Sequence, residues 1–272
     1  MTTPTPIHLP GAPRYQIRPL TPPDAPHALA ILAHANVFHS PLWSTIYPDS
    51  QPARAYFMHQ AALPLITLNI TSGLCFGVFD TEYAFKRPES AAAGPGGKLW
   101  WDYAATEATG AELLEQMDFP LVSVAMAYDV HPPRDGTEWA PILDVFPAFK
   151  HVSAVMERRD TRDPASWKPT RAGEVVRRAG TATRQDYAGR GLAGALTRWH
   201  VGEMRARGYR GYQVTTAHPG LSGVFLGELP GGVRGRVVAR VGTGEVEGEE
   251  GGKVFAGVKK EFDCCLIWVD LR

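Results

Sequence analysis

The feature that most constrains the fold of this chain is a glycine cluster between a predicted strand and a predicted helix. The cluster reads Asp186-Tyr-Ala-Gly-Arg-Gly-Leu-Ala-Gly-Ala-Leu196, after a predicted strand over 174–183 and at the start of a predicted amphipathic helix over 189–207. Glycine lets backbone N–H groups turn toward a bound anion, and the helix N-terminus adds positive partial charge. The segment therefore predicts a phosphate-binding loop; the alternative is a tight turn into an amphipathic helix.

Strands and helices alternate along the rest of the chain. Strands are expected over 15–20, 74–79, 121–130, 209–216, 233–241 and 262–271. Helices are expected over 21–35, 52–68, 112–117, 144–158 and 219–229, with Pro64 kinking or ending the second of them. This order predicts an α/β domain with a mixed sheet.

Composition sets the expected domain organisation. A flexible N-terminal tail is predicted over 1–13, followed by one domain over 14–272. Loop insertions are expected near 86–98, 131–142, 158–173 and 242–252, where glycine, proline and polar residues gather. Two separate domains are the alternative, although no linker-like break near the middle of the chain requires them.

Charge and cysteine content exclude several classes of function. The 28 Lys+Arg balance 28 Asp+Glu, which removes the long-range attraction to nucleic acid or anionic membranes. The N-terminus does not read as a secretory signal, and no apolar run approaches the roughly 20 residues that span a bilayer. Cys75 stands alone and Cys264 adjoins Cys265, so no disulfide framework or zinc spacing is present. We expect a cytoplasmic protein without nucleic-acid or membrane partners.

Other phosphate-binding motifs fit the glycine cluster poorly. The letters from Gly189 to Gly194 satisfy GxGxxG, but a dinucleotide site needs an acidic residue about 20 positions later, and 209–213 contain none. No Gly-Lys-Ser/Thr of a P-loop follows a glycine loop, and the catalytic loops of a protein kinase are not recognisable. Metal ligation by His27 and His34 is not expected, because no carboxylate or thiolate accompanies them at ligand spacing.

The segment resembles the GCN5-related N-acetyltransferase (GNAT) superfamily, whose hallmark is Arg/Gln-x-x-Gly-x-Gly/Ala. Aligned on 188–193, Gly191 and Ala193 match this pattern, whereas Ala188 departs from it. The resemblance is firm over 174–229. It implies a GNAT-like α/β fold, with a mixed, mostly antiparallel central sheet flanked by helices and interrupted by loop insertions.

The resemblance also implies a donor and its binding residues. Acetyl-CoA would be the co-substrate, and no metal would be needed. Backbone amides would cradle the CoA pyrophosphate, and the edge of the preceding strand would pair with the pantetheine arm. The cradle residues are Gly189, Arg190, Gly191, Leu192, Ala193 and Gly194, and the strand residues are Thr181, Ala182 and Thr183. The acceptor would be a small-molecule or peptide amine that attacks the thioester directly, and a homodimer is compatible with this function.

Catalytic candidates are few. Glu174 stands where several members of the superfamily keep a catalytic glutamate, with a solvated strand-end acid as the alternative. His218 takes the place of a common asparagine and is a candidate acid or base, with a capping role as the alternative. Phe225 occupies the place of the tyrosine that commonly protonates the leaving thiolate. A CoA-binding pseudo-enzyme and a non-catalytic interaction protein therefore remain as alternative functions.

Overall fold

The structure is a computed structural model that describes residues 7–9, 11–248, 251–255, 258 and 262–272. The chain divides into two compact units, each assembled from several segments. Unit 1 comprises 1–39, 50–127 and 180–197, and unit 2 comprises 40–49, 128–179 and 198–272. Residues 1–6 and 10 of the predicted tail lie outside the described residues, whereas Ile7–Leu9 form a strand, β1.

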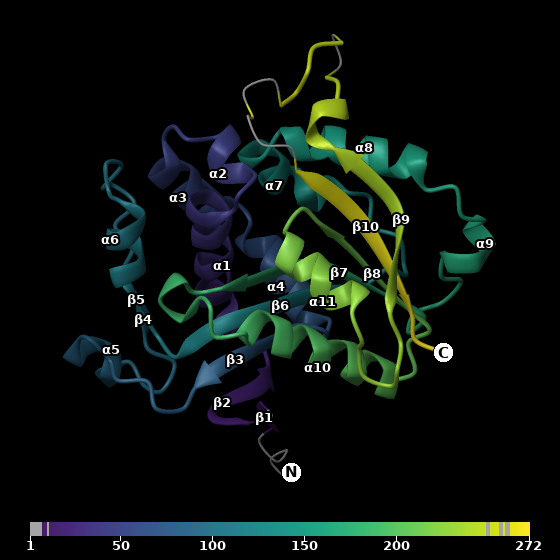
Figure 1. The fold of residues 1–272 in the computed structure, drawn as a ribbon. Coiled ribbons are helices and arrows are strands. Elements are labelled where there is room, and N and C mark those ends of the chain that lie inside the picture. Colours follow the sequence, from purple (N-terminus) through teal and green to yellow (C-terminus); the bar gives the residue numbers. More distant parts are fainter. Residues whose placement is uncertain (1–6, 10, 249–250, 256–257, 259–261) are drawn as a thin grey trace. The chain divides into compact units, whose positions relative to one another are not determined.

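Unit 1 is built on an antiparallel sheet (Figure 1). Its strands follow the order β1, β2 (Ala12–Pro19), β3 (Phe76–Asp80) and β6 (Leu121–Asp129). Ile17 lies opposite Val78, and Val78 lies opposite Ser123, so the apolar pair Ile17 and Val78 shares a face of the sheet with the polar side chain of Ser123. The last part of β7 (Val175–Thr183) follows β6, because the Arg184 amide donates to the Val122 carbonyl at 2.8 Å.

The helices of unit 1 include the one expected over 21–35 and confirm the break expected at Pro64. A 3₁₀ turn over Pro22–Asp24 leads into α1 (Ala25–His34), and the Asp24 carboxylate accepts hydrogen bonds from the amide and hydroxyl of Thr21. The predicted helix over 52–68 is two helices, α3 (Gln51–Ala61) and α4 (Leu63–Thr71). Pro64 lies in the first turn of α4, where a missing backbone N–H does no harm. Helix α6 (Gly110–Glu115) is capped by Thr109.

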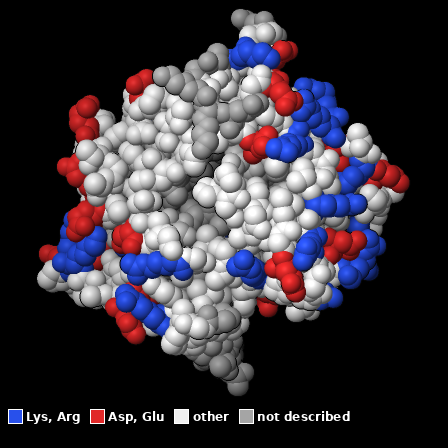
Figure 2. Space-filling view, viewed as in Figure 1, with Lys and Arg blue, Asp and Glu red and all other residues white. Residues whose placement is uncertain are grey.

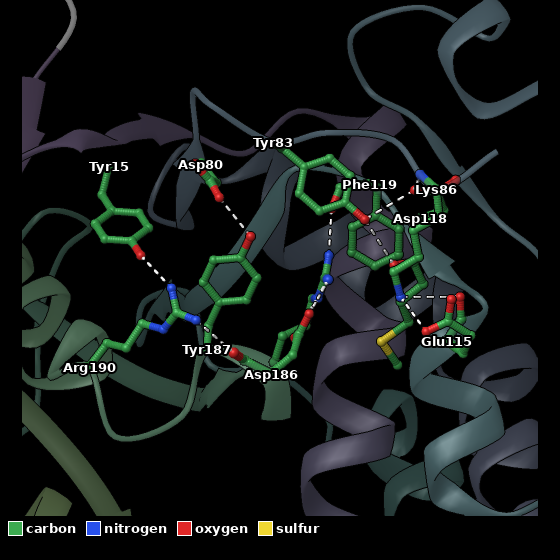
Figure 3. A network of polar contacts seen from close by, with 12 residues as sticks. Tyr15, Asp80, Tyr83, Lys86, Glu115, Asp118, Phe119, Asp186, Tyr187 and Arg190 are labelled. Atoms are coloured by element: carbon green, nitrogen blue, oxygen red, sulfur yellow. Dashed lines mark hydrogen bonds and ion pairs between the residues drawn. The ribbon is translucent and has the colours of Figure 1, made fainter. Parts of the chain in front are cut away.

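The segment 86–98 is ordered by contacts that its composition does not reveal. It contains α5 (Pro88–Ala92) and ends in β4 (Lys98–Leu99), which pairs with β5 (Met117–Asp118). The fully buried Asp118 accepts hydrogen bonds from the amides of Lys86 and Arg87 and from the Tyr83 hydroxyl, part of the network in Figure 3. Where the sequence predicts a loop insertion, the structure therefore has a short helix and strand anchored by Asp118.

Unit 2 carries the parallel strand pair and a C-terminal hairpin (Figure 1). Residues Val175–Arg178 of β7 pair in parallel with Gly211–Val214 of β8 (Gly211–Thr216). Strand β10 (Asp263–Asp270) lies antiparallel between β8 and β9 (Gly235–Gly242). The sheet is thus mixed but mostly antiparallel, which confirms the predicted α/β fold class.

The described helices of unit 2 are α2 (Trp43–Ile46), α7 (Ala140–Val145), α8 (Ala148–Arg159), α9 (Pro164–Trp167), α11 (Pro219–Leu226) and the second half of α10 (Leu192–Ala206). Helix α9 lies within the predicted insertion near 158–173, and α7 begins within the one near 131–142. Pro147 separates α7 from α8 where one helix over 144–158 was expected. Val152 and Met156 of α8 pack in one buried cluster with Val241 of β9 and Leu266 of β10. This cluster is the core of the unit.

The surface agrees with the charge balance of the sequence. On the face seen in Figure 2, acidic and basic side chains lie interspersed rather than in a field of one sign. A search of the described helices finds none that is long and apolar enough to cross a membrane.

Candidate functional site

The glycine cluster forms a strand-to-helix loop in unit 1. After β7 ends at Thr183, a 3₁₀ turn over Gln185–Tyr187 leads to the loop, and α10 begins at Leu192. Gly189 and Gly191 have φ values of 76° and 74°, which is left-handed backbone that favours glycine. A Cβ at either position would meet nothing within 4 Å. Glycine is therefore needed for the backbone conformation, and the space beside it is open.

The loop offers a run of backbone donors. The amides of 189–194 have no acceptor within the described part of the chain, whereas the amides on either side do. Ala188 donates to the Gln185 carbonyl at 3.1 Å, and Ala195 donates to the Gly191 carbonyl at 3.0 Å. A helix by itself leaves its first four N–H groups without a partner in the helix. The loop adds to these groups, because its unpaired amides begin before the first helical residue. Such a cluster at a helix N-terminus binds anions.

A cation is fixed beside the loop by a polar network (Figure 3). The Arg190 guanidinium donates to the Tyr15 hydroxyl and the Asp186 carbonyl, each at 3.1 Å, and lies 4.6 Å from the centroid of the Tyr187 ring. The Tyr187 hydroxyl in turn donates to Asp80 at 2.6 Å. The loop therefore has a positioned positive charge even though residue 188 is alanine.

The carboxylate of Asp80 is the buried end of this network. Arg14 donates to both of its oxygens, at 2.7 and 2.6 Å. Burial alone raises the pKa of Asp80, but the hydrogen bonds from Arg14, Tyr187 and the Glu82 amide outweigh it and hold the pKa below its ordinary value. Asp80 is therefore ionised at neutral pH and fixes the position of Tyr187.

A second arginine orders the turn that precedes the loop. Arg184 is 1% exposed and donates to the Phe119 carbonyl at 2.6 Å. It also donates to both oxygens of Asp186, at 3.1 and 2.6 Å. Burial lowers the pKa of this guanidinium, but its contacts with Asp186 outweigh that effect and raise it. Arg184 and Asp186 thus hold the 3₁₀ turn at the end of β7.

The predicted donor residues gather in one unit. Thr181, Ala182 and Thr183 lie at the end of β7, and all of the predicted cradle residues follow within the same unit. On the side of β6, Ser123 donates to the Ala182 carbonyl at 3.1 Å and shares a 2.8 Å hydrogen bond with the Thr183 hydroxyl. The end of β7 and the loop therefore belong to one unit, and their role as the donor site stays a prediction.

Glu174 is held by several groups in unit 2. Its carboxylate accepts from the Thr170 amide at 2.8 Å and lies 3.4 Å from the Arg210 guanidinium. The hydrogen bond from Thr170 and the charge of Arg210 lower the pKa of Glu174, although burial opposes them. A carboxylate with a lowered pKa is a weaker proton acceptor, so these contacts favour a structural role for Glu174.

His218 lies far from Glu174. The Glu174 carbonyl accepts from the Gly211 amide at the start of β8, and His218 follows Gly211 by seven residues. At about 3.3 Å per strand residue, the two candidates are roughly 20 Å apart and do not share one reacting atom. His218 is exposed just before α11, and its amide donates to the Thr216 hydroxyl at 3.1 Å.

Phe225, at the position where the superfamily commonly has a tyrosine, is a core residue. Phe225 is 0% exposed and lies on α11, with its ring 5.8 Å from that of Tyr212. The Tyr212 hydroxyl is itself buried against Nδ1 of His200 at 2.8 Å. Neither aromatic side chain is placed to donate a proton to a ligand. Among the described residues, no group of three or more His, Cys, Asp and Glu could hold a metal ion.

Sequence reasoning missed the residues that position Arg190. Tyr15 is 175 residues from Arg190, and Asp80 is 107 residues from Tyr187. Contacts over such separations leave no local pattern. The only local signal was the pair of residues Tyr187 and Arg190 within the glycine cluster itself.

Comparisons with known proteins bear on the fold. No protein-family model and no curated protein sequence matches the chain. Solved structures match nearly all of it. The C-terminal condensation domain of Ebony, in complex with beta-alanyl-dopamine, is 11% identical with a TM-score of 0.57, and the match covers 94% of this chain and 98% of that one. Arylalkylamine N-acetyltransferase 2 from Aedes aegypti is 9% identical with a TM-score of 0.57, covering 95% and 99%.

A third match is the polyamine N-acetyltransferase of Drosophila melanogaster, which catalyses the formation of N-acetylagmatine. It is 13% identical with a TM-score of 0.50, covering 94% of this chain and 99% of that one. At these identities the likeness concerns the fold alone. The chain has the fold of the GNAT superfamily, as its motif resemblance predicts.

Proposed function

We propose that this protein is an acyl-CoA-dependent N-acyltransferase that transfers an acetyl group from acetyl-CoA to an amine. The observation that carries the proposal is the run of six backbone amides over 189–194 that have no acceptor among the residues described in the structure, beside the fixed charge of Arg190. A CoA pyrophosphate is an anion of the kind that such a helix N-terminus binds. The GNAT fold supports this choice among phosphate ligands.

The transfer is a direct attack. The neutral amine nitrogen adds to the thioester carbonyl carbon and loses a proton to a base or to water. The C–S bond then breaks, and CoA leaves as a thiolate that takes up a proton. The strand residues Thr181, Ala182 and Thr183 align the pantetheine arm through their backbone, and a backbone N–H there polarises the thioester carbonyl. The cradle residues hold the pyrophosphate. No covalent enzyme intermediate is required.

His218 and Glu174 are the two candidates that the sequence predicts for the acid or base that transfers protons in this reaction. His218 is exposed, and an imidazole can both donate and accept a proton, so it is the better candidate for acid or base. The prediction of Glu174 as general base stays a prediction, and its hydrogen bonds with Thr170 and Arg210 argue for a strand anchor. The proton transfer that His218 does not perform, either from the amine or to the leaving thiolate, takes place with water.

Calorimetric titration of acetyl-CoA into the purified protein tests the donor site. Saturable binding is expected, and Gly191→Glu should abolish it because a carboxylate would stand in the anion site. Gly73→Glu is the matched control, since Gly73 also has a positive φ of 72° and open space around its Cβ position, and it belongs to unit 1. A folded wild-type protein that binds neither acetyl-CoA nor CoA would overturn the proposal.

One observation favours a second candidate function, a CoA-binding protein without turnover. Phe225 has no hydroxyl and is fully buried at the place of the family's proton donor. Release of free CoA thiol with a panel of amines separates the two functions. Binding without thiol release for every amine would favour the pseudo-enzyme.

A further inference from the structure

Two histidine side chains lie next to each other where α1 ends in unit 1. His34 is the last residue of α1, and His39 is the last residue of the π-helical turn that follows it over Ala35–His39. The centroids of the two imidazole rings are 4.9 Å apart. His34 is 2% exposed, whereas His39 is exposed to solvent. The pair therefore extends from the interior of the protein to its surface.

The π-helical turn that carries His39 is held by two side chains. Nδ2 of Asn36 donates to the Leu32 carbonyl at 2.9 Å, and Nε2 of Gln51 donates to the Val37 carbonyl, also at 2.9 Å. A π-helix is rare and occurs mostly as a single turn, frequently at a functional site. The two hydrogen bonds fix the backbone of this turn, and with it the position of His39.

Helix α1 packs against the strand that is predicted to align the donor. A Cβ at Gly180 would lie 3.0 Å from Cδ2 of Leu32, and Gly180 directly precedes Thr181 on β7. His39 follows Leu32 by seven residues, which is about 10 Å along a helix. All of these residues belong to unit 1. The contact therefore places the histidine pair near the end of β7.

His34 connects the pair to the turn that follows β7. Its imidazole interacts electrostatically with Asp186 and Arg184, which hold that turn. Its Nε2 lies 2.7 Å from the Gly110 carbonyl, and because a carbonyl only accepts, Nε2 carries the proton. Burial lowers the pKa of His34 to about 4. His34 is therefore neutral at pH 7 and does not repel a proton that arrives at His39.

The imidazole of His39 is available to accept a proton. It makes no hydrogen bond with any residue that the structure describes, so its unprotonated ring nitrogen faces no competing donor there. Burial lowers the pKa of His39, which favours the neutral imidazole at pH 7. A neutral imidazole has one acceptor nitrogen, as a general base requires.

Three other candidate bases of unit 1 are engaged or weak. Both carboxylate oxygens of Asp186 accept hydrogen bonds from Arg184. Each ring nitrogen of His59 has a hydrogen-bond partner at 2.9 Å. Burial lowers the pKa of His27 to about 4, so its imidazole is a poor proton acceptor. His39 is better placed than these three groups to take up a proton.

We propose that His39 accepts the proton that the attacking amine loses. This inference rests on the proposed acyl transfer and names the proton acceptor for it. As the amine nitrogen bonds to the thioester carbonyl carbon, its N–H proton passes to a water molecule, and that water passes a proton to the ring nitrogen of His39. The imidazolium returns the proton to solvent after the products leave. The transfer that is left for His218 is then the one to the leaving thiolate.

The first test is the variant His39→Ala. Primary alkyl, arylalkyl and diamine acceptors are assayed by release of CoA thiol with saturating acetyl-CoA. We expect kcat to fall about 100-fold, because a general base contributes a rate factor of this size. Acetyl-CoA affinity, measured by calorimetry, should equal that of the wild type, since His39 is not a cradle residue.

His8→Ala is the matched control. His8 is also an exposed histidine of unit 1, but it lies on the short strand β1. Its kcat should equal that of the wild type. Urea unfolding of both variants checks that the fold is intact.

Chemical rescue separates proton transfer from packing. Imidazole added to His39→Ala should raise kcat severalfold as its concentration increases, and should leave His8→Ala unchanged. Triazole has a ring of the same size but is a much weaker base, so it should not restore kcat. Equal rescue by the two compounds would show that His39 only fills space, and would overturn the inference.

The outcomes separate this inference from the proposed function. An unchanged kcat in His39→Ala, or a loss that imidazole does not restore, overturns the role of His39 and leaves the acyl transfer intact. A wild-type protein that binds acetyl-CoA but releases no CoA thiol with any amine removes the transfer, and the role of His39 with it. Failure to bind acetyl-CoA overturns the donor site and is detected by calorimetry before the assay.

Discussion

The Tyr187 hydroxyl donates a 2.6 Å hydrogen bond to Oδ2 of Asp80, which joins the turn before the glycine loop to the end of β3. The Asp80 side chain is 0% exposed and also pairs with Arg14. The Arg190 guanidinium packs over the face of the Tyr187 ring, 4.6 Å from its centroid. The position of a charged residue in the loop therefore depends on a carboxylate more than 100 residues earlier in the chain.

Tyr187→Phe should weaken both stability and donor binding. The change removes a hydrogen bond to a charged acceptor and keeps the ring, so we expect a loss of about 2 kcal/mol in the free energy of unfolding. Acetyl-CoA affinity should fall severalfold because Tyr187 no longer fixes the loop. Urea unfolding and calorimetry measure the two effects.

Tyr83→Phe is the matched control for this variant. The Tyr83 hydroxyl donates to Asp118 at 3.1 Å, so the change also removes a tyrosine–aspartate hydrogen bond in unit 1. Its stability should fall by a similar amount, with acetyl-CoA affinity unchanged. Equal affinities for both variants would contradict a role of the Asp80 network in the donor site.

Asp80 should make stability depend on pH in the acid range. Its pKa in the folded protein lies below the ordinary value of about 3.9, so the folded state favours the ionised form. The stability that it contributes is present above the ordinary pKa and is lost as the pH falls through the lower folded value. Urea unfolding from pH 7 to pH 3 should therefore show a steeper acid loss for the wild type than for Asp80→Asn. If the free energy of unfolding fell equally with pH in the wild type and in Asp80→Asn, Asp80 would not be the source of the acid loss.

The parts of the structure that follow local rules were predictable from the sequence. Periodic apolar positions gave the strands around the loop and α10, and Pro64 gave the break between α3 and α4. The glycine loop was predictable because left-handed backbone at a strand–helix junction leaves a signature in the sequence itself.

The parts that depend on distant partners were not predictable. Asp118 anchors the segment that its glycine and alanine content made look flexible. Arg190 looks like an ordinary loop arginine until Tyr15 and Tyr187 are placed around it. One sequence contains no signal for such pairings, because they arise from packing between elements far apart in the chain.

Variants of Glu174 and His218 should have different effects. Glu174→Gln removes the charge that faces Arg210 and Arg171, so we expect lower stability and an unchanged pH profile of kcat/KM. His218→Gln should leave stability and acetyl-CoA affinity unchanged. It should lower kcat by about 100-fold, because a general acid or base contributes a rate factor of at least this size. A kcat that falls about 100-fold in Glu174→Gln but not in His218→Gln would reverse the assignment.

Gly211→Ala should destabilise unit 2 strongly. Gly211 is the first residue of β8, and a Cβ there would come within 2.1 Å of the Trp268 ring on β10. Trp268 is 4% exposed and stacks against Arg162, so it has little room to move. Overpacking of this kind costs about 1–3 kcal/mol or more. Gly223→Ala is the control, because nothing lies within 4 Å of its Cβ position. A wild-type unfolding midpoint in Gly211→Ala would contradict the close approach.

The three cysteines should be unreactive in the native protein. In that case a thiol reagent can measure the CoA released by acyl transfer without a background from the protein. Cys75, Cys264 and Cys265 are 0%, 3% and 8% exposed. Burial raises the pKa of Cys264 to about 12 and also raises that of Cys265, so little of the reactive thiolate forms at pH 8. An aromatic disulfide reagent should label none of them within minutes in buffer and all three in urea. Fast labelling in buffer would show an opening of β10 and would require cysteine-free variants for the acyl-transfer assay.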